Sequence, residues 1–326
     1  MLFIVGSTRS GTTWLHTMLG EHSQVATTVE MTTFPKYIGP VLKIWNEEKK
    51  NYDEHLQNQV NIETSEGVIG GLPALWSERE YIDFLRSFLA VTNEKYMFKN
   101  PQASHILEKA PDNSLFTNEI FLFYENAKFI HMIRDGRDAV CSKIAAKTRV
   151  GFGPTSVQEA TESWKTYVLG AQKARLRGVD RYLEVRYENL LQSPHEELEK
   201  ILSFCELKYN SLLIDTIVSN NTFDKMKNTG KTADREFRVN SKFFFKGKSG
   251  NWRTDLSPDQ QYIFSRIAGE LLVDLGYVSD NEWWYSSIGQ KYKLECSFIF
   301  RKFLVEFLSL GRSIFRFLSL RWLGHR

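Results

Sequence analysis

Residues able to bind an anion cluster near the start of the chain, where Gly-Ser-Thr-Arg-Ser-Gly-Thr-Thr begins at Gly6. Gly6, Gly11 and Thr13 match the spacing G-x-x-x-x-G-K-[ST] of loops that bind nucleoside triphosphates, but Thr12 stands where the lysine belongs. Backbone N–H groups of such a loop, at the start of a helix, bind phosphate oxygens even without the lysine. We therefore predict a phosphate-like ligand that is not a triphosphate, with Arg9 as the nearby cation. The alternative is a strand–turn–helix corner whose glycines only allow tight packing.

A second candidate anion site follows the apolar run Lys128–Ile133, which delivers Arg134 to its carboxyl end. A helix is predicted to start near Asp138, and Ser142 then lies about one turn into it. The planar guanidinium of Arg134 and the Ser142 hydroxyl could jointly hold a phosphate. The alternative is a solvated corner in which the neighbouring acidic and basic side chains pair with one another.

Taken together, R-S-G-T-T from Arg9 and R-D-x-R-D-x-x-x-S from Arg134 resemble the sulfotransferase family that uses 3′-phosphoadenosine 5′-phosphosulfate (PAPS). The resemblance covers most of residues 2–280. It implies that Arg134 and Ser142 hold the 3′-phosphate of this donor. It also implies that the 5′-phosphosulfate is held by the first loop, made of Arg9, Ser10, Gly11, Thr12, Thr13 and Trp14.

Two further segments resemble parts of the same family. Tyr187, in Arg-Tyr-Glu-Asn-Leu, corresponds to a tyrosine that contacts adenine; the alternative is a tyrosine that packs at the end of a strand. Lys246-Gly247-Lys248 resembles a late loop that closes over the 3′-phosphate, although the arginine usual in the family is missing. Lys246 or Lys248 would take its place, and the alternative is a plain lysine turn.

Sulfuryl transfer needs a general base for the acceptor proton and cations for the departing phosphate. Small-molecule sulfotransferases use the His of a Lys-Thr-His stretch as base, but the matching stretch from Lys99 reads Lys-Asn-Pro. Protein-tyrosine sulfotransferases and many bacterial relatives carry a catalytic Glu at a set distance after R-S-G-T-T. Glu30 lies at this distance, so we predict Glu30 as the base. Burial near the sulfuryl group would raise its pKa. The alternative is a solvated or salt-bridged Glu30. His105 is a weaker candidate for the base, and the alternative for it is an ordinary helix residue. Lys99 and Arg9 are the candidate cations.

These residues need a scaffold, and short apolar runs alternating with helix-like stretches predict one. The pattern favours an α/β fold, a doubly wound parallel sheet containing a phosphate-binding loop and flanked by helices. Ligands bind such sheets at the carboxyl ends of the strands, where the candidate residues fall. The predicted strands are Leu2–Val5, Tyr96–Phe98, Lys128–Ile133 and Tyr182–Val185.

The segments between these strands divide the chain further. Residues 31–95 carry no clear strand, and we interpret them as a helical and loop insertion that shapes the acceptor pocket. Residues 155–177 are predicted to form one long helix, and residues 222–250 a mobile loop. The chain is thus expected to hold a catalytic domain over 1–290 and a helical tail over 291–326.

The tail differs in charge from the rest of the chain. Residues 291–326 hold eight Lys or Arg and two Asp or Glu, which leaves 34 basic against 37 acidic residues elsewhere. The main body is therefore not the basic surface of a nucleic-acid-binding protein. Residues 294–323 form a predicted amphipathic helix without an uncharged run long enough to span a bilayer. Such a basic helix could lie on an anionic membrane, contact a partner chain in an oligomer, or pack on its own domain.

Three widely separated cysteines, Cys141, Cys205 and Cys296, offer neither a metal-binding pattern nor a disulfide framework. No targeting segment precedes the first predicted strand. Together these features favour a cytoplasmic protein, with membrane association only through the tail.

The sequence thus predicts a PAPS-dependent sulfotransferase that needs no metal and transfers the sulfuryl group directly, in line, to an acceptor. The acceptor hydroxyl or amine could belong to a small molecule, glycan, lipid or peptide. A small-molecule kinase is one alternative, weakened by Thr12 and by the lack of an obvious Mg²⁺-binding carboxylate after a strand. A non-catalytic protein that binds a nucleotide or a membrane is another.

Overall fold

The computed structural model describes residues 1–58, 71–234, 239, 242, 246–285, 289–297 and 299. The chain divides into two compact units, Met1–Asn251 and Trp252–Arg326. All predicted site residues belong to the first unit. The second unit is described separately below.

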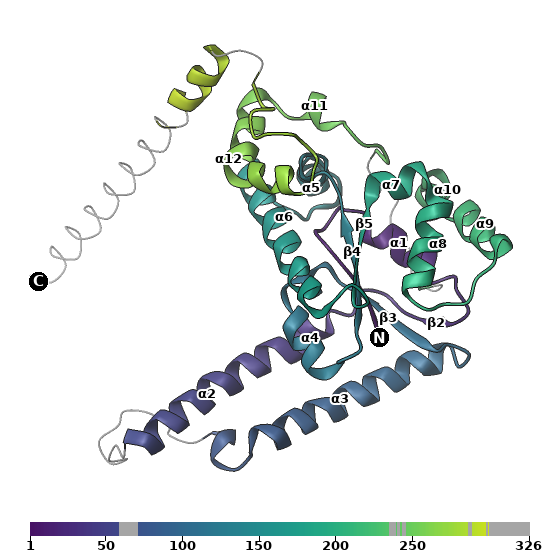
Figure 1. Cartoon of the computed structure of the whole chain (residues 1–326), viewed down its shortest axis with the longest axis vertical. Coiled ribbons are helices and arrows are strands. Elements are labelled where there is room, and N and C mark those ends of the chain that lie inside the picture. The colour runs from purple at the N-terminus through teal and green to yellow at the C-terminus, as the bar shows by residue number, and fades with distance from the viewer. Residues whose placement is uncertain are drawn as a thin grey trace, which may run out of the picture. The chain divides into compact units, whose positions relative to one another are not determined.

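The first unit is built around one parallel sheet with the strand order β2-β3-β1-β4-β5 (Figure 1). Its register places Leu2 opposite both Leu107 and Lys128. The predicted doubly wound α/β fold is confirmed, with β1 at the centre. The five strands are β1 (Leu2–Val5), β2 (Val25–Ala26), β3 (His105–Lys109), β4 (Lys128–Ile133) and β5 (Tyr182–Arg186).

Both faces of the sheet are buried, because successive side chains of a strand point to opposite faces. Leu2 and Ile4 of β1 pack in one apolar cluster with helices α1, α8 and α9, whereas Phe3 and Val5 pack in another with α2, α3 and α4. These helices are α1 (Thr12–Leu19), α2 (Gly39–Asn58), α3 (Glu78–Lys99), α4 (Thr117–Phe123), α8 (Pro194–Phe204) and α9 (Ser211–Asn220).

The remaining helices of this unit are α5 (Gly136–Val150), α6 (Val157–Gln172), α7 (Tyr187–Gln192) and α10 (Phe223–Thr229). A π-helix spans Phe34–Ile38, and 3₁₀ turns span Leu72–Ala74, Pro111–Leu115 and Lys173–Arg177. The long helix predicted over 155–177 is therefore α6 continued by the last of these turns.

The predicted strand Tyr96–Phe98 is wrong, because these residues form the last turn of α3. A capping box of Ser77 and Glu80 starts this helix, and Asn100, which precedes a proline, ends it. The true strand is β3, which begins only at His105. Consequently Lys99 ends a helix, whereas Lys109 ends the strand next to β1.

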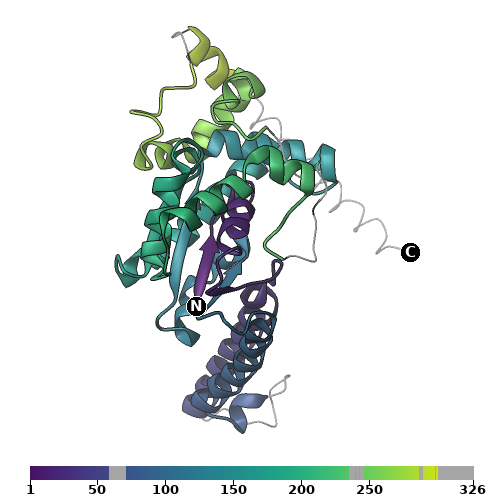
Figure 2. The ribbon, with the colours of Figure 1, turned by 90° about the vertical axis from the view of Figure 1, so that its right-hand side faces the viewer.

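The insertion over 31–95 is helical, and its described part contains no strand, as predicted. Helices α2 and α3 lie side by side and extend away from the sheet as one arm (Figures 1 and 2). The stacked rings of Trp45 and Tyr81, 4.1 Å apart, join the two helices. Residues 59–70, between them, lie outside the described part of the chain.

The segment predicted as a mobile loop, 222–250, contains α10 and is thus partly helical. Residues 235–238, 240–241 and 243–245 of it lie outside the description.

In the second unit, α11 (Trp252–Asp255) precedes α12 (Pro258–Asp274). Tyr262, Trp284 and Leu294 pack together there. The predicted amphipathic tail falls mostly on residues 300–326, outside the described residues. Within the described part of the chain, no helix combines the length and hydropathy required to span a bilayer.

Candidate functional site

The phosphate-loop sequence folds as a tight turn between β1 and α1. Gly6 and Gly11 have φ angles of 134° and 95°, which side-chain-bearing residues rarely adopt. A Cβ at Gly6 would meet the Met132 carbonyl oxygen at 2.3 Å, and one at Gly11 would meet the Tyr187 ring at 2.7 Å. Both glycines are therefore required, the first for packing on β4 and the second to admit Tyr187.

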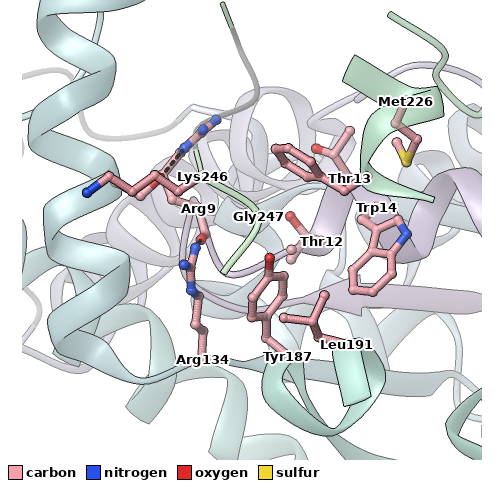
Figure 3. A pocket seen from close by; sticks show the side chains of 13 residues that line it. Arg9, Thr12, Thr13, Trp14, Arg134, Tyr187, Leu191, Met226, Lys246 and Gly247 are labelled. Atoms are coloured by element: carbon pink, nitrogen blue, oxygen red, sulfur yellow. Dashed lines mark hydrogen bonds between the residues drawn. The ribbon is translucent and has the colours of Figure 1, made fainter. Parts of the chain in front are cut away.

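Beside this loop lies a cavity of about 770 Å³, a volume that includes the space open to solvent (Figure 3). Segments that are far apart in the sequence line this cavity. They are the loop and α1, the ends of β4 and β5, α5, α7, α10 and the lysine turn, Lys246-Gly247-Lys248. Its lining residues are Arg9, Gly11, Thr12, Thr13, Trp14, Arg134, Ser142, Tyr187, Leu191, Phe223, Met226, Lys246 and Gly247. Ten of these were predicted from the sequence.

Two guanidinium groups converge on the cavity. Arg9 Nε donates to Ser142 Oγ at 3.1 Å, and Arg134 donates to the carbonyl oxygens of Arg9 and Lys248 at 3.0 and 3.1 Å. Burial, and next the positive charge of Arg134, lowers the pKa of Arg9 to about 10. The like charges disfavour one another, so an anion bound between them would stabilise both.

Two buried polar atoms at this site have no hydrogen-bond partner among the described residues: Ser10 Oγ and Arg134 Nε. Buried polar atoms are normally paired, because an unpaired one costs free energy. A ligand with several acceptor oxygens would supply the missing partners. The residues present thus fit a phosphorylated ligand. Among the described side chains, no three of His, Cys, Asp or Glu gather as a metal site would require.

Tyr187 starts α7 directly after β5, and its ring lies beneath the Arg134 guanidinium at 4.4 Å. Trp14 meets the same ring edge to face at 5.8 Å. Tyr187 therefore packs at the end of a strand and also lines the cavity. The remaining predicted lysine, Lys248, does not line the cavity itself; its carbonyl oxygen accepts from Arg134.

The acidic and basic residues after Arg134 form a corner that is buried, not solvated. Arg137 and Asp135 pair at 2.7 Å, and both side chains are less than a tenth exposed. Asp138 accepts from the backbone N–H of Gly250 at 2.6 Å, which ties the segment after the lysine turn to α5. The neighbouring charges thus pair with one another, as the alternative interpretation expected, but in a buried corner.

Glu30 lies in the segment between β2 and the π-helix, where it accepts a hydrogen bond from Lys109 Nζ at 2.5 Å. The Lys109 side chain is 7% exposed and that of Glu30 is 40% exposed. The burial expected for Glu30 is therefore not found, and the salt-bridged alternative describes it. Its partner, however, is a buried lysine at the carboxyl end of β3, the edge of the sheet where ligands bind.

Lys109 was missed by the sequence reasoning. Its signal is Lys109-Ala110-Pro111, which repeats the Lys-x-Pro pattern of Lys99. This pattern follows the apolar pair Ile106-Leu107 after one intervening residue, Glu108. Lys99 itself contacts Thr28 and Asp234 instead of Glu30.

His105, the weaker base candidate, begins β3 and so lies at the opposite end of that strand from Lys109. It hydrogen-bonds to the neighbouring Ser104 at 2.9 Å. The structure thus brings Lys109 to Glu30, and separates both from His105.

The sequence of this chain is similar to those of known proteins. The profile of the sulfotransferase family matches residues 2–211. A protein-tyrosine sulfotransferase of Drosophila melanogaster is 27% identical over 216 residues, which cover 66% of this chain and 39% of that protein. Protein-tyrosine sulfotransferase 1 of Danio rerio is 26% identical over 219 residues, covering 66% and 55%. The chain thus spans less than two thirds of the length of these relatives.

Solved structures show the same fold. A mouse sulfotransferase complexed with PAP (adenosine 3′,5′-bisphosphate) superposes with a TM-score of 0.52 at 15% identity. The match covers 85% of this chain and 86% of that one. The sulfotransferase domain of a Synechococcus olefin synthase gives 0.51 at 17% identity, covering 83% and 94%.

Proposed function

The chain belongs to the sulfotransferase family, and on that premise we propose that it transfers the sulfuryl group of PAPS to a hydroxyl or amine of an acceptor. The observation that carries the proposal is the cavity in which Arg9 and Arg134 converge beside two unpaired buried polar atoms. A triphosphate loop would need a lysine at Thr12, whereas a doubly phosphorylated adenosine needs two separate anion sites.

In the proposed complex, Arg134 and Ser142 hold the 3′-phosphate, and the loop from Arg9 to Trp14 holds the 5′-phosphosulfate. Tyr187, on the cavity wall, contacts the adenine. Lys246 and Gly247 cover the nucleotide from the opposite wall, with Lys248 tied to Arg134 through its backbone. Support comes from their shared cavity and from the mouse structural neighbour, which was solved with PAP, the desulfated donor.

We assign the chemistry to Glu30 and Lys109. Glu30 accepts the acceptor proton as the acceptor oxygen or nitrogen attacks sulfur, and the bond between sulfur and the 5′-phosphate oxygen breaks. The electron pair of that bond stays on the phosphate, where Arg9 and Lys109 stabilise the charge. Thr27, three residues before Glu30, hydrogen-bonds to His16 of α1 at 2.7 Å, which supports a position of the Glu30 segment beside the loop helix.

This assignment replaces Lys99, the sequence-based candidate, by Lys109. Lys109 ends a sheet strand and contacts the proposed base, whereas Lys99 ends the arm helix α3 and is 47% exposed. The Glu30–Lys109 pair also orients the carboxylate before the acceptor arrives.

For the acceptor, we propose a peptide or protein hydroxyl, and a tyrosine first. The support is that the curated relatives described above are protein-tyrosine sulfotransferases. Small-molecule, glycan and lipid hydroxyls belong in the same test panel.

Replacing the base tests the mechanism. We expect Glu30→Gln to reduce transfer at least about a hundredfold, since the amide cannot accept the proton. Stabilisation by adenosine 3′,5′-bisphosphate (PAP) should be retained. The measurement is transfer of radiolabelled sulfur from PAPS to the acceptor panel, together with thermal shifts.

Glu196→Gln is the matched control, because Glu196 is an exposed carboxylate in the first turn of α8, away from the cavity and the insertion. Turnover of Glu30→Gln close to wild type would overturn the assignment of the base.

A further inference from the structure

The loop that carries Glu30 is held from two sides. On the sheet side, Thr27 Oγ1 donates to the carbonyl oxygen of Leu107 at 2.7 Å, and the Thr33 N–H donates to Glu108 at 3.3 Å. On the other side, Asp234 contacts Thr28, two residues before Glu30. This second contact is distant in sequence and has no role in the mechanism above.

Thr28, Lys99 and Asp234 form a closed triangle of hydrogen bonds. Thr28 Oγ1 donates to Asp234 Oδ2 at 2.6 Å, and Lys99 Nζ donates to the same Oδ2 at 3.0 Å and to Thr28 Oγ1 at 3.1 Å. Hydrogen bonds to a charged acceptor are about twice as strong as neutral ones. One buried carboxylate oxygen therefore fixes the threonine, and the half-exposed lysine compensates its charge.

The carboxylate is itself held in place by its short segment, residues 231–234. Thr232 Oγ1 donates to the Asp234 carbonyl oxygen at 2.9 Å, and Lys231 pairs with Glu21 just after α1. A Cβ at Gly20 would meet that of Ala233 at 2.9 Å, so the segment lies directly against the end of α1. Asp234 is 9% exposed.

The same segment follows α10, which forms part of the cavity wall. Phe223 and Met226 of α10 line the cavity, and Phe223 packs on Gly247 of the lysine turn, where a Cβ would lie 2.4 Å from its ring. The chain then leaves α10 at Gly230, with φ 61°, and reaches Asp234 four residues later. Thus one short stretch joins the proposed donor cavity to the Glu30 loop.

We infer that Asp234 is a positioning residue for the base: it acts through Thr28 to hold Glu30 in its working place, with Lys99 as its counter-ion. The inference rests on the proposed sulfuryl transfer. It gives Lys99 a role in positioning, and it predicts that these side chains affect catalysis more than donor binding.

A double-mutant cycle on Thr28→Val and Asp234→Asn tests this inference. We expect each single variant to lower kcat about tenfold or more, with the KM for PAPS and the stabilisation by PAP within about twofold of wild type. Thr28→Val removes, and Asp234→Asn weakens, the same charge-assisted hydrogen bond, so the loss of the double variant should be clearly smaller than the product of the two single losses. Asp215→Asn, an exposed carboxylate on α9, is the control.

A second readout separates positioning of the base from a loss of structure. For a tyrosine peptide and its ring-fluorinated counterpart, whose hydroxyl ionises more readily, the Asp234→Asn loss should be smaller for the fluorinated peptide, because it depends less on a base.

The inference would be overturned by any of three results: equal losses of kcat for the two peptides, additive effects of the two single substitutions, or an unchanged kcat. In each case, transfer by the wild type would still support the proposed function. Absence of transfer by the wild type across the acceptor panel would overturn both.

Discussion

The ion pair between Glu30 and Lys109 joins a half-exposed carboxylate to a buried ammonium group at the end of β3. We expect Lys109→Met to lower kcat about a hundredfold or more, because it removes a cation beside the departing phosphate and releases Glu30. Lys99→Met should lower kcat less, about tenfold, since Lys99 acts only through Asp234 and Thr28. Steady-state transfer rates of the two variants measure the difference.

Methionine keeps most of the lysine's apolar volume in both variants, so the comparison isolates the charge. A larger loss for Lys99→Met than for Lys109→Met would restore the sequence-based assignment and contradict the geometric one.

A second residue-scale prediction concerns Lys143, whose amine donates to Ser163 Oγ at 2.8 Å and is buried. Burial lowers its pKa to about 7 from the ordinary 10.5. Below pH 7 both folded and unfolded chains carry the proton, so the folded state bears the full cost of burying the charge. That cost shrinks as the pH rises toward 10.5. Lys143→Met should therefore stabilise the fold most near pH 6, and progressively less up to about pH 10.

Unfolding free energies of Lys143→Met and wild type across this pH range provide the measurement. Lys147→Met, one turn later on the exposed side of α5, is the control and should show no such trend. A stability gain of Lys143→Met that grows with pH would contradict the predicted direction of this pH dependence.

Most cavity residues could be predicted because their motifs are local: Arg9 and Thr12 lie in one turn, and Arg134 and Ser142 lie within one strand–helix junction. Lys109 and Asp234 could not, since each acts through a partner about 80 residues or more away. Glu30 was found by its spacing after the loop, but that spacing gives no sign of its ion pair with Lys109, which comes from another strand.

At the scale of elements, the turn between β1 and α1 depends on Gly11. We expect Gly11→Ala to weaken PAP binding about tenfold or more, because its φ of 95° is strained for alanine and the new Cβ would displace Tyr187. Titration of PAP by calorimetry measures the effect.

Gly151→Ala is the matched control. Gly151 also has a positive φ, 83°, but a Cβ there would meet nothing within 4 Å. It should cost about 1 kcal/mol of stability and leave PAP affinity unchanged. Equal PAP affinities of the two variants would contradict the close approach of Tyr187 to the loop.

The elements themselves show where sequence patterns succeed and fail. β1, β4 and β5 were predicted because apolar residues dominate each of them, although β4 includes His131 and β5 includes Glu184. Tyr96–Phe98 is equally apolar but continues the helical spacing of the buried residues Leu85 and Leu89. As part of α3, Tyr96 packs on Ala26 of β2 and Ile106 of β3. β3 contains Glu108 and Lys109, whose burial in a polar network masks it as a strand.

At the scale of the whole molecule, every residue that lines the cavity belongs to Met1–Asn251. We therefore expect deletion of residues 300–326 to leave the stabilisation by PAP within about 1 °C of that of the full chain. The deletion spares Leu294, which packs with Tyr262 and Trp284. Thermal shifts of the two proteins, with and without PAP, provide the comparison. A lost PAP response would show that the tail contributes to the donor site.

Co-sedimentation of the same two proteins with anionic liposomes separates the three interpretations of the tail. Loss of sedimentation on deletion would indicate membrane binding. A change of oligomeric state would indicate a partner chain, and neither effect would indicate packing on its own domain.

The proposed sulfuryl transfer is tested by transfer of radiolabelled sulfur from PAPS to a tyrosine peptide, run beside transfer of labelled phosphate from ATP–Mg²⁺. We predict label on the peptide from PAPS, with release of PAP in equal amount, and none from ATP–Mg²⁺. Label from ATP–Mg²⁺, or no transfer from PAPS to the peptide or to any other acceptor of the panel, would contradict it.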